Sequence, residues 1–550
     1  MKKFFTIVFI AMINFFLASY LYCQATQEWV AIYIGNYGAH TPFLALDDSG
    51  NVLITGTSGV DYEAENFCTV KYNNSGIQQW ISYYNGPAYC AIDEASCITT
   101  DHSGNVYVAG NSANITRDFA VVKYNVSGDV LWIARYDGPG YGYDKPVAIA
   151  VDDFENVYVT GHSMGSGSNF DFATIKYNAA GTVQWIQRYN GPANSADYPY
   201  DLALDNSNNV FITGYSLGAN EVNADCLTIK YNSSGVEQWI ARYDDPAHAD
   251  DVAKKIVVDS LGNSYITGSS RSSTFGTYSR CLTIKYNSDG AEQWIAKFGG
   301  LLGADGANDI VLDNFGNLFV AGTTYNNQSG YDYATIKYDS NGVQEWVNIY
   351  NGSGNGLDCV HSIAIDKWGD VYVTGESLGS GTNSDYATIK YTNEGIEKWI
   401  ARYNRAETSL EQAFDMAVDD SGNVFVTGNG VYTGATYAFV TIKYSQLTTG
   451  ILDDVNSIPD QFILHQNYPN PFNSSTRICW QSPVGSYQTL KVFDVLGNEV
   501  DILVDEFKSA GRYEVDFNPV SSIKNLASGF CFYQLKAGDF IQTKKMIYLK

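Results

Sequence analysis

The sequence predicts an all-β protein: an eight-bladed β-propeller followed by a small Ig-like β-sandwich. The first observation is a motif, most complete from Ala148 to Pro192, whose copies fill most of the 550 residues. The second is its period near fifty residues, which is typical of a propeller array. The third is a composition with 51 Gly and 42 Tyr, which suits tight turns between aromatic strands. The Trp that closes each copy recurs every 51 to 55 residues, at Trp29, Trp80, Trp132, Trp185, Trp239, Trp294, Trp346 and Trp399.

Each copy divides into four expected strands, which we name a to d in chain order. In the most complete copy, strand a ends at Asp152, strand b covers 156–161, strand c ends at Tyr177 and strand d surrounds Trp185. Alternating apolar and polar residues with turn residues between the runs indicate antiparallel hairpins.

The ends of the repeat array are offset from the blades. A lone strand d at Trp29 comes first, and the last copy stops after strand c at Tyr444. We therefore expect the N-terminal strand to complete the last blade, which removes the exposed edges of an open array. A seven-bladed ring with a stray repeat is the alternative, and it leaves the strand count unexplained.

The chain ends predict two further segments. Lys2 and Lys3 precede an apolar run that ends near Cys23 to Ala25, so residues 1–25 are predicted to be a cleaved export signal. An uncleaved membrane anchor is the alternative. The propeller is expected at 26–445, a polar linker at 446–458 and the Ig-like sandwich at 459–550.

Composition excludes several functions. A net charge of −26 argues against nucleic acid as a partner. The nine cysteines show no zinc spacing, and Cys68, Cys226 and Cys281 fall where other copies carry apolar or aromatic residues, which indicates buried thiols. Cys479 and Cys531 could form a disulfide in the last domain. No catalytic or nucleotide-binding signature is present, so we expect neither an enzyme nor a bound cofactor.

An aspartate recurs at the turn between strands a and b. Its expected role is structural, because the carboxylate can accept backbone N–H bonds in a tight turn. A calcium loop would need alternating carboxylates, which these turns lack. The eight residues are Asp47, Asp101, Asp152, Asp205, Asp259, Asp313, Asp366 and Asp419.

A second acidic position lies eight residues before seven of these aspartates, at the start of the innermost strands. A ring of acids around one mouth of the central channel could hold a cation or a basic ligand. The alternative is that each carboxylate binds loop backbone or the neighbouring blade. The seven are Asp93, Asp144, Asp197, Asp251, Asp305, Asp358 and Glu411. The repeated Trp is expected to pack between adjacent blades and not to bind sugars.

The repeats resemble the bacterial SBBP β-propeller repeat, whose units read D-x-x-G-N-x-Y-V-T-G before a strand ending in K-Y. The resemblance covers about three quarters of the chain, and that family implies no assigned reaction. The spacing from Gly76 to Trp80 is also similar to the tryptophan docking motif of eight-bladed quinoprotein dehydrogenases. The vicinal cysteine pair and cofactor insert of those enzymes are not visible here.

The last domain resembles the type A C-terminal sorting domain of the type IX secretion system, found in Bacteroidetes and related phyla. The matching residues are Asn467, Tyr468, Pro469, Asn470, Pro471 and Phe472, with Lys544, Lys545 and Lys550 in the final strand. The resemblance implies the type IX machinery as a partner. It also implies translocation across the outer membrane, then release or surface attachment, usually with removal of the domain. No membrane span is expected in the mature protein.

Together these observations predict a secreted or cell-surface binding or adhesion module whose ligand is a glycan, a peptide or another surface protein. The expected contact surface comprises the d–a loops, such as 136–146, and the b–c loops, such as 162–171, because loops vary on a rigid scaffold. The alternative is a quinoprotein-like or polysaccharide-active enzyme that uses the channel. The residues that break the repeat, Arg271, Arg280, Trp368 and Arg405, do not combine a nucleophile with a base. A coat protein without a ligand is a third possibility.

Overall fold

A computed structural model describes two compact units, Met1–Gln446 and Leu447–Lys550. The described residues are 25–61, 64–88, 91–218, 223–271, 278–299, 303, 305–405, 409–433, 436–446, 462–464, 467, 472, 476–519, 529–538 and 540–548. Every regular element among them is a β-strand. The predicted export signal before Ala25 and most of the predicted linker lie outside the described residues.

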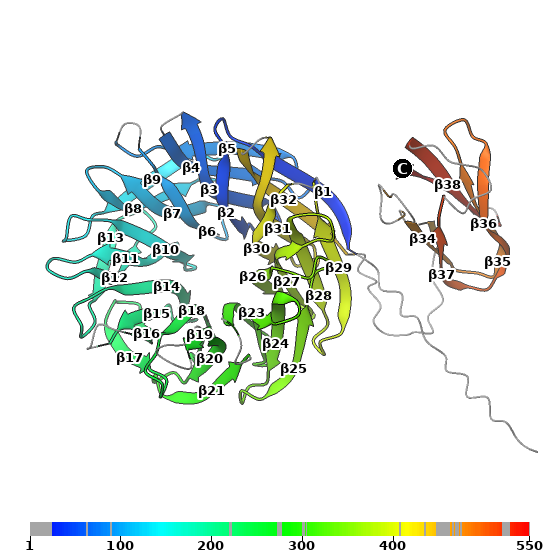
Figure 1. Cartoon of the computed structure of the whole chain (residues 1–550). Coiled ribbons are helices and arrows are strands. Elements are labelled where there is room, and N and C mark those ends of the chain that lie inside the picture. The colour runs from blue at the N-terminus through cyan, green and yellow to red at the C-terminus, as the bar shows by residue number, and fades with distance from the viewer. Residues whose placement is uncertain are drawn as a thin grey trace, which may run out of the picture. The chain divides into compact units, whose positions relative to one another are not determined.

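The first unit is a ring of eight four-stranded antiparallel sheets (Figure 1). We number the blades in chain order and give their strands from the axis outward. Blade 1 contains β2 (Ala39–Leu46), β3 (Val52–Asp61), β4 (Ala64–Tyr72) and β5 (Gln78–Tyr84). Blade 2 contains β6 (Glu94–Thr100), β7 (Val106–Ala113), β8 (Arg117–Tyr124) and β9 (Val130–Tyr136). Blade 3 contains β10 (Asp144–Val151), β11 (Val157–Met164), β12 (Phe170–Tyr177) and β13 (Val183–Tyr189).

The next four blades repeat this order. Blade 4 contains β14 (Asp197–Leu204), β15 (Val210–Leu217), β16 (Ala224–Tyr231) and β17 (Glu237–Tyr243). Blade 5 contains β18 (Asp251–Val258), β19 (Ser264–Arg271), β20 (Ser279–Tyr286) and β21 (Glu292–Phe298). Blade 6 contains β22 (Gly306–Leu312), β23 (Leu318–Asn326), β24 (Gly330–Tyr338) and β25 (Gln344–Tyr350). Blade 7 contains β26 (Asp358–Ile365), β27 (Val371–Leu378), β28 (Ser384–Tyr391) and β29 (Glu397–Tyr403).

Blade 8 confirms the predicted closure of the ring. Its inner strands are β30 (Glu411–Val418), β31 (Val424–Thr433) and β32 (Thr436–Ser445), and its outer strand is β1 (Thr26–Tyr33) from the start of the chain. The pairing runs antiparallel from Thr26 opposite Ser445 to Tyr33 opposite Phe439. The two ends of the repeat array therefore share one sheet.

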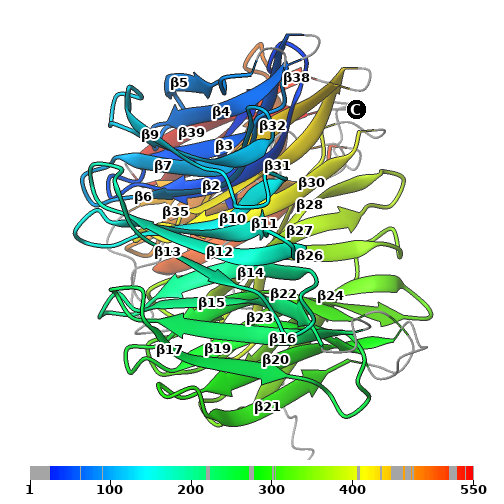
Figure 2. The same cartoon turned by 90° about the vertical axis from the view of Figure 1, so that its left-hand side faces the viewer.

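The core of the ring lies between successive sheets, which stack face to face (Figure 2). Tyr107 and Ala109 of blade 2, for example, share one buried cluster with Val159 and Ile175 of blade 3. The two middle strands of each blade are buried on both faces, whereas the outermost strand has exposed positions, as β17 shows. This burial explains why the strand b and strand c motifs recur with little change.

The repeated Trp locks each blade to the next one, as predicted. The indole N–H of Trp132 donates to the carbonyl oxygen of Ala179 at 3.0 Å, and its ring lies against Gly181. Gly181 has φ +77°, and a Cβ there would lie 2.7 Å from Trp132 Cδ2. Glycine is therefore required at this turn by both its backbone conformation and the close ring. Seven such indole bonds join described residues.

The turn aspartates have the predicted structural role. Asp152 Oδ1 accepts the backbone N–H groups of Phe154 and Asn156 at 3.0 and 2.8 Å, and Oδ2 accepts the Tyr158 hydroxyl at 3.0 Å. The predicted buried thiols are also confirmed, because Cys68, Cys226 and Cys281 are buried and free.

The second unit consists of two sheets around one core. The first sheet contains β33 (Ile463–Leu464), β34 (Thr476–Ser482) and β37 (Gly511–Phe517). The second contains β36 (Glu499–Lys508), β35 (Ser486–Phe493), β38 (Gly529–Ala537) and β39 (Phe540–Tyr548). Trp480 and Leu490, from different sheets, share the buried core. Cys479 and Cys531 are thiols that form no disulfide in this structure. The Ig-like assignment stays a prediction.

Candidate ligand-binding face

The seven acids predicted to ring the channel mouth are buried, with at most 1% of each residue exposed. Asp144 shows their role: Oδ2 accepts the N–H of Gly138 at 2.8 Å, and Oδ1 accepts that of Met164 at 2.9 Å. Asp93 and Asp358 make the same two contacts in their blades. The alternative reading, a carboxylate that ties the d–a loop to strand b, therefore describes Asp93, Asp144 and Asp358, while Asp197 and Asp251 each accept a backbone N–H of their d–a loop. Ligand binding does not fit their burial.

Burial also changes the ionisation of these acids. It raises the pKa of Asp144, Asp197, Asp358 and Glu411, and it raises that of Asp251 to about 6. Each carboxylate is desolvated by the blade and only partly compensated by the N–H groups that it accepts. These groups are structural acids of the loop connections.

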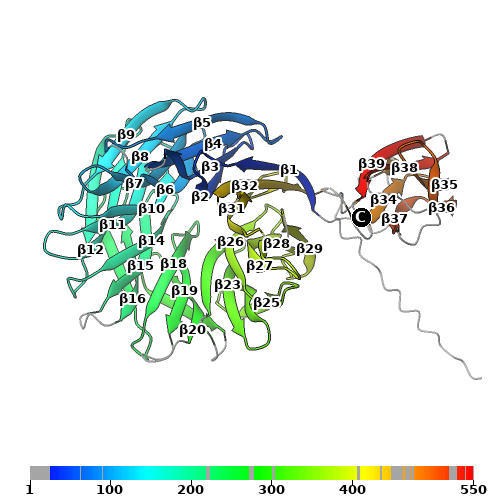
Figure 3. The ribbon, with the colours of Figure 1, turned by 45° about the horizontal axis from the view of Figure 1, so that its top comes forward.

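The inner strands carry a second set of charges that the sequence reading missed. Asp201, Lys255, Asp309 and Asp415 occupy one register position, directly after a bulge in strand a. Three of them are aspartates that accept an N–H of the next blade, as Asp415 Oδ2 does from Leu44 at 2.8 Å. Lys255 Nζ lies 3.9 Å from Asp201 Oδ2. The signal in the sequence was a charge four residues after the first acid of strand a. The three aspartates therefore join neighbouring blades, whose ring is seen obliquely in Figure 3.

We call the end of the propeller that carries the d–a and b–c loops the loop face, and the opposite end the turn face. Three loop-face positions differ from blade to blade: the second residue of the strand a motif, the residue after the Gly of strand b, and the residue seven before the Tyr that ends strand c. In blades 2, 3 and 4 they are Glu94, Asn111, Arg117; Lys145, His162, Phe170; and Tyr198, Tyr215, Ala224. In blades 5 and 6 they are Val252, Ser269, Ser279; and Gly306, Thr323, Tyr331.

Large aromatic and charged side chains of blades 2, 3 and 4 form one continuous cluster on the loop face. We call it the blade 2–4 patch. Its members are Glu94, Arg117, Tyr143, Lys145, His162, Phe170, Tyr198, Tyr200 and Tyr215. They come from seven strands and one d–a loop, so no short segment of sequence contains the patch.

His162 lies at the centre of the aromatic part of the patch. Its ring stacks on Tyr143 at 5.8 Å between centroids and meets the rings of Phe170 and Tyr198 edge-on at 5.1 and 4.9 Å. Burial and the nearby Lys145 lower the pKa of His162 to about 4, so the imidazole is neutral at pH 7. His162 is therefore a planar, uncharged member of the aromatic surface.

The aromatic surface continues into blade 4. Tyr198 and Tyr215 lie 5.3 Å apart between centroids, and Tyr200 and Tyr215 lie 6.0 Å apart. Tyr200 is 42% exposed, and the rings of Tyr198 and Tyr215 are partly exposed. Burial raises the pKa of all three phenols, so they keep their protons at neutral pH.

The charged part of the patch contains two cations and one carboxylate. Glu94 lies 3.4 Å from Arg117 Nη1 and 3.7 Å from Lys145 Nζ, and each side chain is about one third exposed. The Arg117 guanidinium also stands over the Tyr143 ring at 5.7 Å. These three groups carry a net charge of about +1 at neutral pH.

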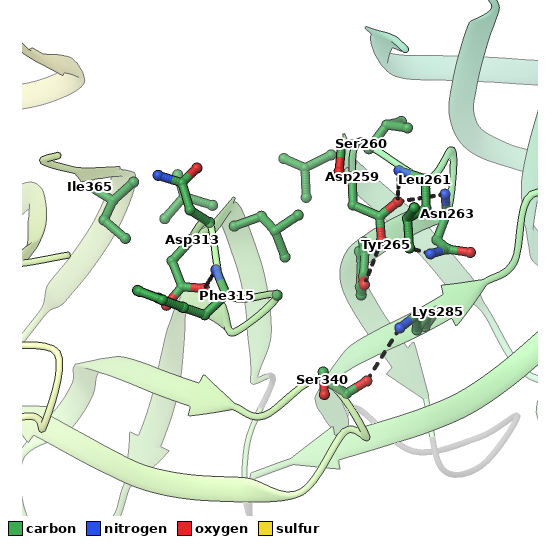
Figure 4. A pocket seen from close by; sticks show the side chains of 16 residues that line it. Asp259, Ser260, Leu261, Asn263, Tyr265, Lys285, Asp313, Phe315, Ser340 and Ile365 are labelled. Carbon is green, nitrogen blue, oxygen red and sulfur yellow. Dashed lines mark hydrogen bonds between the residues drawn. The ribbon is translucent and has the colours of Figure 1, made fainter. Parts of the chain in front are cut away.

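The turn face has a cavity of about 660 Å³ between blades 5 and 6 (Figure 4). Its polar groups already have partners: Asp259 accepts N–H groups of Leu261 and Asn263, and Lys285 donates to the carbonyl of Ser340. Leu261 and Phe315 line it and are 78% and 85% exposed. This cavity has an apolar rim but few free polar groups to orient a ligand.

The described residues contain one carboxylate trio close enough for a metal ion: Asp118, Asp137 and Asp144. Asp118 pairs with Arg135 at 2.9 Å, and Asp144 is held by backbone N–H groups. Since two of the three carboxylates already have these partners, we assign no metal to the trio.

Comparisons with known families match both parts of the chain. Residues 184–220, 247–276 and 293–327 match the SBBP β-propeller repeat, and residues 466–549 match the secretion system C-terminal sorting domain. The chain therefore contains SBBP β-propeller repeats and a type IX secretion C-terminal sorting domain. The sorting domain implies export to the cell surface or the medium through the type IX machinery. Among the described residues, no helix is both long and apolar enough to cross a membrane.

The sorting motif is partly described. Asn467 donates from its side chain to Thr476 at 2.9 Å, and Phe472 packs in the core of the domain against Tyr548. Lys544 and Lys545 lie in β39. Tyr468, Pro469, Asn470, Pro471 and Lys550 lie outside the described residues. The described part of the motif therefore contributes to the fold of the sorting domain.

Other likenesses of this chain are distant. An uncharacterised WD repeat-containing protein of Acanthamoeba polyphaga mimivirus is 23% identical over 81% of this chain, which spans 37% of that protein's length. The β-propeller domain of the Trilobed protease from Pyrococcus furiosus is 12% identical, with a TM-score of 0.39 over 66% of this chain and 96% of that one. The WD40 domain of SCAP from fission yeast is 10% identical, with a TM-score of 0.41 over 76% and 97%. These likenesses indicate no ligand.

Proposed function

We propose that this protein is an exported binding module whose ligand binds on the loop face, centred on the blade 2–4 patch. The observation that carries the proposal is the contrast between blades. The frame residues recur in every copy, whereas loop-face residues change and become large, aromatic and charged in three adjacent blades. Packing of a repeat does not require this change, because blade 5 folds with Val252, Ser269 and Ser279 at the same positions.

The patch has the physical properties of a recognition surface. Its aromatic rings are partly exposed and hold each other in place, so a ligand can bury area against them at little entropic cost. Its side chains stand on strands of a closed ring, which keeps the site rigid. The sorting domain supports a setting outside the cell, where the module would meet glycans, peptides or surface proteins.

The proposal does not include catalysis. The enzyme alternative, which places a reaction in the channel, would require turnover of a polysaccharide or reduction of a quinone. Assays of the exported protein for both reactions test that alternative directly. Product formation that survives loop-face substitution but stops after substitution of Asp201 or Asp309 would favour it.

The binding proposal is tested with substitutions that copy one blade into another. Tyr198→Val with Tyr215→Ser places the blade 5 residues Val252 and Ser269 in blade 4, so the fold should tolerate the change. Phe315→Ser on the turn face is the matched control, since blades 1, 2, 4 and 8 carry Ser there. The full exported chain is screened against glycan, peptide and surface-protein arrays.

We expect at least one ligand to be lost, by tenfold or more in affinity, in the double variant and retained in the control. Ligands that bind both proteins equally would overturn the assignment to the loop face. Loss in Phe315→Ser alone would move the site to the turn face.

A further inference from the structure

We infer that the ligand of the blade 2–4 patch is an acidic saccharide, whose sugar ring lies on the tyrosines and whose anionic group meets Arg117 and Lys145. This inference rests on the proposed function and names the ligand class of the same site. The anionic group is a carboxylate or a sulfate, since both present oxygen acceptors to a guanidinium and an ammonium.

The first argument is the sign of the local charge. The whole chain carries −26, yet Arg117 and Lys145 share the single carboxylate of Glu94. The contacts of 3.4 and 3.7 Å leave most of the five N–H donors of Arg117 free of that carboxylate. All three side chains are partly exposed, so an incoming anion can reach the cations without unfolding anything. An isolated cationic spot on an acidic protein favours a small anionic group over a large polyanion.

The second argument is the aromatic surface beside the cations. Tyr200, Tyr198 and Tyr215 form a partly exposed row that continues through His162 to Tyr143. The C–H face of a pyranose ring is apolar and packs on such rings, while its hydroxyls remain at the edge. Because His162 is neutral at pH 7 and is enclosed by rings, it extends this apolar surface without adding a competing charge.

The third argument is the hydroxyl groups of the tyrosines. Within the residues that the structure describes, no hydrogen bond is formed by the hydroxyls of Tyr198, Tyr200 or Tyr215. Each phenol keeps its proton, because burial raises its pKa. Three hydroxyls that can both donate and accept therefore border the stacking surface, which matches the mixed hydrogen bonding of sugar hydroxyls.

Other blades of the loop face lack this combination of cations and aromatic rings. Blade 5 carries Val252 and Ser269 at the positions of Lys145 and His162. In blade 7 the charged residue is Glu376, which accepts a hydrogen bond from Gln412 at 2.7 Å. The cations and the aromatic row thus coincide in blades 2 to 4, where Tyr143 lies under Arg117 and stacks on His162.

The experiment measures binding of the full exported chain to matched short oligosaccharides by calorimetry. Oligogalacturonates and their methyl esters differ in the charge of the carboxyl group, and sulfated and unsulfated isomalto-oligosaccharides differ in sulfation. We expect tighter binding, by tenfold or more, to the acidic member of at least one pair, and weaker binding as salt is raised. The two pairs distinguish a carboxylate from a sulfate ligand.

Variants that copy residues from other blades test which charged side chains bind the anionic group. Arg117→Ser copies Ser279 and Lys145→Val copies Val252, and each should weaken acidic binding by tenfold or more. Glu94→Gln copies Gln412 and removes the competing carboxylate, so it should tighten acidic binding severalfold. A gain of affinity separates recognition from loss of folding. Ser279→Ala in blade 5, which copies Ala224, is the matched control: it loses the hydrogen bond to the Asp305 carbonyl oxygen but should leave saccharide binding unchanged.

The outcomes separate the two proposals. Equal binding of charged and neutral members, or weaker acidic binding in Glu94→Gln, would overturn the acidic saccharide. A neutral or peptide ligand lost in Tyr198→Val with Tyr215→Ser would leave the proposed function standing and refute this inference. Ligands whose affinity is unchanged in every loop-face variant would overturn both proposals.

Discussion

Replacing Arg188 by Ile tests how neighbouring blades are held together. Arg188 Nη1 donates to the Tyr136 hydroxyl of blade 2 at 2.8 Å and to Ser163 Oγ at 2.7 Å. Nη2 donates to Asp171 Oδ2 at 2.8 Å. The same clasp forms around Arg135, Arg242 and Arg402 in blades 2, 4 and 7. In blade 8, Ile32 occupies the position of Arg188 and Ala438 that of Asp171, so the arginine and the aspartate are absent together.

The expected cost follows from the burial of Asp171. Its side chain is 6% exposed and that of Arg188 is 21% exposed. Arg188→Ile leaves the carboxylate charged and buried without its cation, which costs about 3 kcal/mol of unfolding free energy. Adding Asp171→Ala recreates the pair of blade 8, and the double variant should lose about 1 kcal/mol relative to the wild type. Asp171→Ala should therefore recover about 2 kcal/mol in the Arg188→Ile background.

The assay is guanidinium unfolding of the four proteins of this cycle, followed by tryptophan fluorescence. The pH dependence gives a second readout: in blade 6, where Ile349 occupies the position of the arginine, burial raises the pKa of the equivalent Asp332, so the stability lost in Arg188→Ile should also depend on pH. A carboxyl group whose pKa is raised by folding destabilises the folded protein above that pKa. The lost stability returns as the pH falls through it. An equal cost of Arg188→Ile with and without Asp171, at every pH, would refute the reasoning.

Three further predictions address other contacts. Gly181→Ala should destabilise the protein by several kcal/mol more than Gly167→Ala, because both have positive φ but only the Cβ at 181 meets the Trp132 ring; equal melting temperatures would contradict this. A chain that begins at residue 34 lacks β1 and should melt at lower temperature, as judged by calorimetry, because β32 then has an open edge; an unchanged melting temperature would show that closure adds no stability. His162→Asn copies Asn111, and this variant should lose less stability than the wild type as the pH falls from 6.5 to 4. The wild-type imidazole, whose pKa is lowered to about 4, takes up a proton more readily when unfolded; parallel pH curves for the two proteins would count against it.

The repeat frame could be predicted from the sequence because each frame residue acts locally. The turn Asp before Gly-Asn and the Gly four residues before the Trp each specify a turn within a few residues. The acids at the start of strand a could not be assigned from position alone. Asp144 lies where the channel mouth was expected, yet its side chain is buried toward the loop backbone. Side chains alternate between the two sides of strand a, and a bulge between Pro146 and Ala148 shifts this alternation. The shift decides which side chains point inward.

The sequence by itself determined the number of blades, the closing strand and the secretion route. The array begins with a lone strand d and ends without one, so only a ring in which the first strand completes the last blade pairs every strand. The sorting motif is a continuous segment of sequence and can be recognised without the structure. The tertiary structure decided which side chains form the candidate site. Glu94, Tyr143 and Tyr198 lie in three different blades, and they belong to one patch because the ring brings adjacent inner strands together at one register. Contacts across blades depend on that register, which no single repeat contains.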